Sequence, residues 1–173
     1  DRGRTAGPIR LLIKGERHKP GEVIEPATLS SIPALEKNLD PPPANSKTTH
    51  RRLQFAQWIT RPDHPLTARV WVNRIWQWYF GRGLVVSSGD FGTQGNAPSH
   101  PELLDWLASE LIANRWSTRH IHRLILQSNT WRQSATPNAA HATLDPSNTA
   151  LWRWQPRRQE AEAIRDSVHG IAG

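Results

Sequence analysis

The sequence predicts a mainly α protein of about five packed helices, with long Gly/Pro-rich loops and a small N-terminal β element. Apolar residues recur at helical spacing in five stretches between residue 47 and the end of the chain. Long loops separate these stretches, and 11 Gly and 14 Pro among 173 residues supply the turns. Nine Trp provide core material, since each can bury about 150–250 Å².

Residues 1–46 are expected to form the β element and a Pro-rich linker or strap. The apolar run Ile9–Ile13 predicts a strand, Lys19–Glu22 predicts a turn, and Val23 and Ile24 predict a second short strand. The segment from Pro26 to Ser46 has little hydrophobic periodicity and five prolines, which is typical of an extended linker.

Residues 47–173 are expected to form one helical domain, truncated at both chain ends. Ser99 with Glu102 fits a capping box, and Ser117 is a second candidate N-cap. We expect a short strand at 84–86 and a polar loop at 134–150. The predicted helices run from 47 to 60, from 66 to 80, from about 101 to 111, from about 118, and from 159 to 171.

Composition excludes several classes of site. The chain has no Cys, which excludes disulfides, thiolate zinc sites and thioether-attached haem within it. It has no run of about 18 apolar residues, so no membrane span is predicted. The chain begins with Asp and stops within a helical pattern, so we expect a fragment of a longer protein.

The net charge of +7 raises the question of a polyanionic partner. Arg supplies 18 of the 22 basic residues and suits fixed contacts to carboxylates or phosphates. No dense Lys/Arg run is present, so a solvated or internally paired surface is the main interpretation. Nucleic-acid binding through the Arg excess remains an alternative.

A polar stripe crosses the otherwise apolar helix at 66–80. Arg69, Asn73 and Gln77 are four residues apart, with Arg74 beside them. Asp90 is the nearest unpaired acid in sequence, so a structural pairing of Arg69 or Arg74 with Asp90 is one interpretation. Binding of a carboxylate, phosphate or sulfate is the other. Likewise, the Trp set can be core or a stacking platform for sugars or bases.

Other candidate motifs have simpler explanations. His120 and His122 are two apart on a predicted helix and point about 200° apart, so they cannot share a metal ion. His100 precedes a helix and more simply assists its cap, although it stays a ligand-binding candidate. The glycines at 89, 92 and 95 lack the context of a dinucleotide fingerprint and are expected to permit positive φ. We therefore predict no metal site and no cofactor in this chain, and catalytic residues stay unknown.

Several longer motifs resemble one family. They are Asp63–Gln77, Phe80–Val85, Ser88–Gly92, His100–Ala108, Leu124–Ser134 and Arg157–Asp166. Together they resemble the planctomycete-specific C-terminal domain called domain of unknown function 1553. The resemblance covers roughly residue 47 to the end, and residues 14–23 fit that family's lead-in.

The resemblance implies an accessory domain of an exported, cytochrome-c-like multidomain protein in the periplasm or cell envelope. Haem c would be held by an upstream C-x-x-C-H segment, which this chain lacks. Redox work or polysaccharide processing would be the setting, and other domains of the same polypeptide the partners. The family supplies no catalytic residues. The alternatives are binding or processing of an anionic glycan by Arg69, Asn73, Arg74, Asp90 and His100, or nucleic-acid binding.

Overall fold

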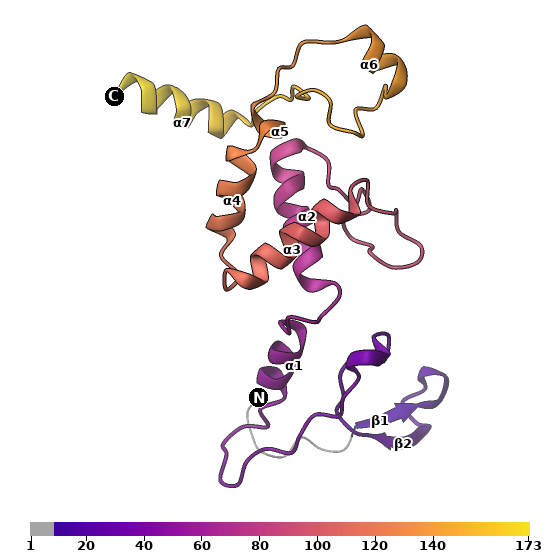
Figure 1. Cartoon of the computed structure of the whole chain (residues 1–173). Helices are drawn as coiled ribbons and strands as arrows, with labels where there is room; N and C mark the ends of the chain where they lie inside the picture. The colour runs from indigo at the N-terminus through magenta and orange to yellow at the C-terminus, as the bar shows by residue number, and fades with distance from the viewer. Residues whose placement is uncertain (1–8) are drawn as a thin grey trace. The chain divides into compact units, whose positions relative to one another are not determined.

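The computed structural model of the chain describes residues 9–173 (Figure 1). The chain divides into two compact units, one ending at Thr67 and the other spanning Ala68–Gly173. Within the described residues there are seven helices and one two-stranded sheet, which confirms the mainly α prediction. The expected domain boundary after residue 46 stays a prediction.

The first unit begins with the predicted β element. Strands β1 (Ile9–Leu12) and β2 (Pro20–Ile24) pair antiparallel, with Ile9 opposite Ile24. A short 3-10 turn, η1 (Ile13–Gly15), follows β1. The turn expected at Lys19–Glu22 was wrong, because β2 already begins at Pro20. Neither strand has a buried residue, so this hairpin contributes little to the core.

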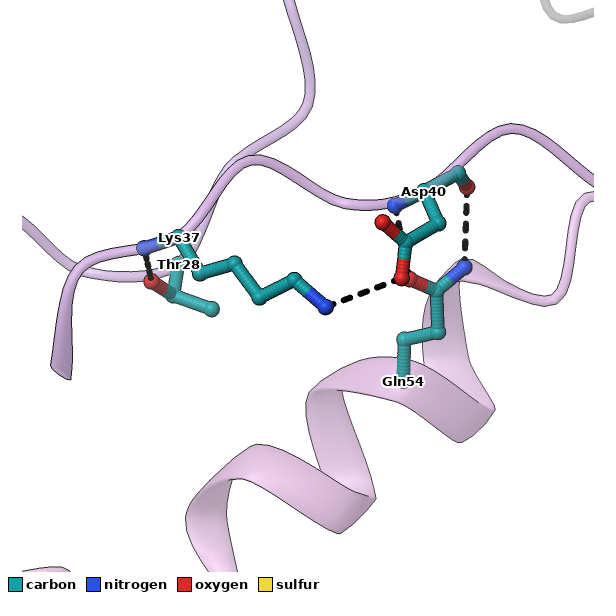
Figure 2. Close-up of polar contacts among 4 residues, drawn as sticks. All are labelled: Thr28, Lys37, Asp40 and Gln54. Carbon is teal, nitrogen blue, oxygen red and sulfur yellow. Dashed lines mark hydrogen bonds and ion pairs between the residues drawn. The ribbon is translucent and has the colours of Figure 1, made fainter.

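The Pro-rich strap is held against helix α1 (Arg51–Ile59) by side chains of that helix. Figure 2 shows the Gln54 amide facing the Asp40 backbone, accepting from its N–H at 2.8 Å and donating to its carbonyl at 3.0 Å. One turn further along α1, the Trp58 indole donates to the carbonyl of Leu35 at 2.7 Å. Leu35 ends the 3-10 turn η2 (Pro33–Leu35) and is buried. Side chains of α1 thus make the hydrogen bonds to the strap backbone that a neighbouring strand would otherwise make.

Within the strap, Thr28 and Lys37 close a loop onto itself. The Thr28 hydroxyl accepts the Lys37 N–H at 2.8 Å, and the Lys37 ammonium pairs with the Asp40 carboxylate at 2.9 Å (Figure 2). The ion pair is exposed and stabilises the fold by less than about 1 kcal/mol. The buried Thr28 hydroxyl contributes more, because it satisfies a backbone donor.

The second unit is built on α2 (Thr67–Phe80), α3 (Pro101–Ala113) and α4 (Thr118–Gln127), grouped together in Figure 1. Three shorter or peripheral helices follow: α5 (Asn129–Arg132), α6 (Ala139–Leu144) and α7 (Ala161–Ala172). The core consists of Ala68, Val72, Ile75, Trp76, Leu84, Val85, Leu104, Leu107, Ala108, Leu111, Ile121 and Ile125.

Several local expectations for the second unit were wrong. Leu84 and Val85 are buried but form no strand, because a side chain of α2 satisfies the Val85 backbone. Ser99 does not cap α3, since its hydroxyl donates to the Leu84 carbonyl at 3.2 Å. The expected polar loop after Ser134 contains the short helix α6. By contrast, Ser117 caps α4 as predicted, accepting from the His120 N–H.

Candidate functional site

Arg69 projects from α2 toward α3 rather than toward the loop that holds Asp90. Its Nε lies 2.5 Å from Oδ1 of Asp105, so the expected pairing of Arg69 with Asp90 was wrong. The hydrogen bond from Arg69 lowers the pKa of Asp105 below its ordinary value. Both side chains are more than a third exposed, so the pair stabilises the helix contact by less than about 1 kcal/mol.

Asn73 is fully buried and has a structural role. Its amide donates to the Val85 carbonyl at 3.0 Å and accepts the Val85 N–H at 2.9 Å. A Cβ on Gly83 would come within 2.7 Å of the Asn73 amide, so only glycine permits this approach. Asn73 is therefore not available to a ligand.

Asp90 and His100 make local contacts. The Asp90 carboxylate accepts the Gly92 N–H at 2.8 Å, which closes an Asx-type turn. His100 stands at the N-cap position of α3, but its side chain makes no capping hydrogen bond, so the expectation that it assists the cap was wrong. Its ring lies 3.0 Å from the Ser99 hydroxyl. Position 95 requires glycine for a steric reason, because a Cβ there would lie 2.2 Å from the Asp90 carbonyl oxygen. In the described residues, positive φ is absent from all three glycines of this loop, contrary to the sequence-based expectation.

Arg74 lies in a groove of the second unit, which we call the α2 groove. Its volume is about 840 Å³, within the roughly 300–1,000 Å³ that is common for ligand pockets. Of the five candidate residues, Arg74 lines this groove, whereas the other four do not. Its lining includes Trp71, Arg74, Gln77, Trp78, His122 and Arg157.

One face of α2 forms a wall of the groove. Trp71, Arg74, Ile75 and Trp78 are spaced i, i+3, i+4 and i+7, so they share one side of the helix. Ile75 is buried and anchors this face, while the Trp71 and Trp78 side chains are 45% and 77% exposed. Large exposed indoles are costly to leave in water. This face therefore presents two large, exposed indoles to the groove.

Arg157 brings a second guanidinium to the groove. Its Nη2 donates to the Trp78 carbonyl, one of the last carbonyls of α2, which have no helical partner. Gly81 ends the helix with φ of +78°, and its N–H returns to the Gln77 carbonyl at 2.7 Å. The positive φ favours glycine at this position, whereas a Cβ on Gly81 would make only an ordinary contact, 3.8 Å from Cδ of Arg157.

His122 reaches the groove from α4 and is fixed by Tyr79. The phenol oxygen lies 2.7 Å from Nδ1 of the imidazole. Tyr79 in turn packs edge-on against Trp131, with ring centroids 5.1 Å apart. The half-buried aromatic cluster behind the groove therefore holds the His122 ring in one orientation.

The family PSD1, described as a protein of unknown function (DUF1553), matches residues 51–173. The chain belongs to this family. No curated protein and no solved structure matches it. Every residue that lines the α2 groove lies inside the part of the chain that matches DUF1553.

The groove of this DUF1553 chain is cationic, aromatic and free of carboxylates. Its lining contains two arginines and the hydroxyls of Ser88 and Thr118, but no Asp or Glu. Among the residues that the structure describes, Arg74 forms no ion pair. An Arg with free donors beside exposed indoles can bind a planar or ring-shaped anion by stacking and bidentate hydrogen bonds.

Part of this site has a sequence signal that was missed. Trp71, Arg74 and Trp78 fall on one helical face, which the stripe of Arg69, Asn73 and Gln77 does not include. A search for aromatic and cationic residues at i, i+3 and i+7 finds it. No such signal exists for Arg157, because it lies 79 residues after Trp78 in the sequence.

The described residues of this DUF1553 chain contain no group of three or more His, Asp or Glu that could hold a metal ion. His120 lies 2.8 Å from Glu110, while His122 contacts Tyr79, so the two histidines have separate partners. Within residues 9–173 no helix is long and apolar enough to cross a membrane.

Proposed function

We propose that this chain is an accessory domain that binds an anionic glycan in the α2 groove. The observation that carries the proposal is the α2 face on which Arg74 lies between the exposed indoles of Trp71 and Trp78. Sugar rings present an apolar C–H face that packs on indole, and a uronate or sulfate group pairs with guanidinium. Stacking and charge pairing together fit a charged sugar better than a neutral one.

Binding rather than hydrolysis is the proposed activity of this groove. Glycoside hydrolysis by the common mechanisms requires two carboxyl groups that flank the scissile bond, about 5–9 Å apart. The groove lining supplies arginine, histidine, amide and hydroxyl groups but no carboxyl group. A domain of this kind holds or presents a polysaccharide to a neighbouring domain.

The wider setting that we propose is a large exported planctomycete-type protein with an upstream cytochrome-c-like segment. Support comes from the family resemblance alone, since membership of DUF1553 does not specify a cellular location or a redox role. The other domains of that polypeptide would be the partners, in the periplasm or cell envelope. Sequencing the whole gene tests this directly. An upstream C-x-x-C-H segment and an export signal are expected, and their absence would remove the redox and envelope setting.

The binding proposal is tested with polygalacturonate as an anionic glycan and dextran as a neutral one. Trp78→Ala should weaken polygalacturonate binding at least tenfold, because it removes the most exposed indole of the groove. Trp106→Ala is the matched control, since Trp106 is also exposed, at 48%, but lies on α3 outside the groove lining. Affinity is measured by calorimetry at fixed ionic strength. Equal affinity for the two polysaccharides, or equal loss in both Trp variants, contradicts the proposal.

A further inference from the structure

A second, smaller cavity lies between the end of α2 and the loop of residues 145–153. We call it the Arg153 cavity. It is lined by Arg82, Ser99, Ser147, Thr149 and Arg153, among others, and no Asp or Glu is in its lining. Two arginines and three residues with hydroxyl groups therefore line one small space. The cavity shares no lining residue with the α2 groove, so a ligand of the cavity would not require a glycan in the groove.

Arg153 has an unsatisfied donor. Its Nε is shielded from solvent and has no hydrogen-bond partner among the described residues. The guanidinium lies 5.1 Å from the ring centroid of Trp152, a cation–π contact that stabilises the charge without accepting a hydrogen bond. Burying a charged donor without an acceptor costs at least about 1–3 kcal/mol. The charge of Arg153 is therefore only partly compensated by its protein neighbours.

The loop fixes the backbone of Arg153 by side-chain hydrogen bonds. The buried Asn148 side chain donates to the Arg153 carbonyl at 2.9 Å and accepts its N–H at 3.2 Å. Asn148 and Leu151 both have left-handed backbone conformations, with φ of +54° and +55°. Such conformations are costly for a residue such as Leu, and they persist only where surrounding contacts enforce them.

Asp145 is close to the cavity but is already engaged. Its carboxylate accepts the Ala150 N–H at 2.7 Å and the Ser147 hydroxyl at 3.1 Å. Backbone hydrogen bonds, first from Ala150, lower the pKa of Asp145, and the charge of Arg82 makes the smallest contribution. In residues 9–173 neither Arg82 nor Arg153 forms an ion pair with a carboxylate.

The cavity has room for a small ligand. Its volume is about 80 Å³, and on this measure a cavity needs about 10–15 Å³ to hold one water molecule. It can therefore hold several water molecules or a group of about five heavy atoms. We propose that the Arg153 cavity binds a small oxyanion, a sulfate or phosphate group, through the guanidinium groups of Arg82 and Arg153. Charge-assisted hydrogen bonds from Arg favour this chemistry.

The test is an NMR titration of the whole chain with inorganic sulfate and inorganic phosphate, with NaCl reduced to keep ionic strength constant. The Nε–H resonance of Arg153 should shift saturably with either anion. Arg82→Gln and Arg153→Gln should each weaken the binding about tenfold or more. Arg119→Gln, which changes an exposed Arg on α4, should bind like the wild type. Arg82 is also exposed, so Arg82→Gln keeps the test valid if Arg153→Gln does not fold.

A sulfate ester of a monosaccharide provides the second arm. If the ester shifts the same resonance with the same dependence on Arg82, the oxyanion can be part of a larger ligand. If only the inorganic ions do so, the site takes a free anion. No saturable shift beyond that of chloride, or equal affinity in wild type and both cavity variants, overturns the proposal. Trp78→Ala should leave sulfate binding unchanged, which separates this result from the glycan test.

Discussion

At the scale of single residues, Asn73 joins α2 to the buried segment around Val85. Its amide satisfies both backbone groups of Val85 in a site with no solvent access. Asn73→Ala leaves a buried N–H and a buried carbonyl without partners, each costing about 1–3 kcal/mol. We therefore expect Asn73→Ala to lower the free energy of unfolding by about 2–5 kcal/mol in urea denaturation.

Asn96→Ala is the matched control for this prediction. Asn96 is exposed in the loop after α2, and its substitution should change the free energy of unfolding by less than about 0.5 kcal/mol. If Asn73→Ala is no more destabilising than Asn96→Ala, the two buried hydrogen bonds do not have the structural role that we assign to them.

The same residues show what sequence can and cannot indicate about a site. Helical spacing identified the polar group of Arg69, Asn73 and Arg74 but could not separate their roles. Those roles depend on packing partners distant in sequence, such as Asp105, 36 residues from Arg69. Only the face with Trp71 and Arg74 was recoverable, because an exposed face of a helix is encoded locally.

At the scale of elements, the start of α2 is fixed by a buried histidine. Nδ1 of His64 lies 3.3 Å from the backbone nitrogens of Leu66 and Thr67 and 2.9 Å from the Thr67 hydroxyl. It acts as the acceptor that an N-cap residue usually provides. The ring also packs edge-on against Trp58, with centroids 4.8 Å apart. A protonated imidazole has no free Nδ1 lone pair, so this arrangement requires the neutral ring.

Stability should therefore fall in mild acid. Burial lowers the pKa of His64 below its ordinary value near 6.5, although the Asp63 carboxylate partly opposes this. The unfolded chain then binds more protons than the folded one between the two pKa values. The stabilisation is complete above pH 6.5 and is lost as the pH falls toward the folded pKa. We expect Tm to fall between pH 8 and pH 5.

The substitution His64→Asn should lower Tm at pH 8 but reduce the loss of Tm between pH 8 and pH 5. His169→Gln is the control, because His169 is exposed on α7. It should keep the pH dependence of the wild type. Scanning calorimetry at a series of pH values gives both quantities. A pH dependence in His64→Asn as large as in the wild type would assign the effect to other groups.

Elements with strong periodicity were predictable, and elements set by tertiary contacts were not. The helix at Thr67–Phe80 and the Ser117 cap follow local rules of periodicity and hydrogen bonding. The run Leu84–Val86 has strand-like composition, yet the Asn73 side chain takes the place of a neighbouring strand. Ser99 has the right spacing for a cap, but the Leu84 carbonyl competes for its hydroxyl. Both errors come from partners more than ten residues away.

At the scale of the whole molecule, the net charge of +7 is less informative than the position of a few arginines. Arg61 and Arg69 are paired with Asp63 and Asp105. Arg74 and Arg157 line the α2 groove, where no carboxylate is present. A polyanion that binds in the groove should therefore interact with these two cationic side chains. The salt dependence of its affinity should reflect two ionic contacts and not the net charge of the chain.

The salt dependence of polygalacturonate binding distinguishes these two cases. Taking about 0.7 for each ionic contact, as for flexible polyanions, two arginines give a slope near −1.4 in a plot of log K against log salt concentration. Attraction by the entire net charge would give a slope near −5. We expect the shallow slope in the wild type and a decrease of about 0.7 in its magnitude in Arg74→Gln. Arg119→Gln, with the same loss of charge outside the groove, should keep the wild-type slope. A steep slope that both variants reduce equally would show diffuse attraction, and with it retention of duplex DNA at physiological salt.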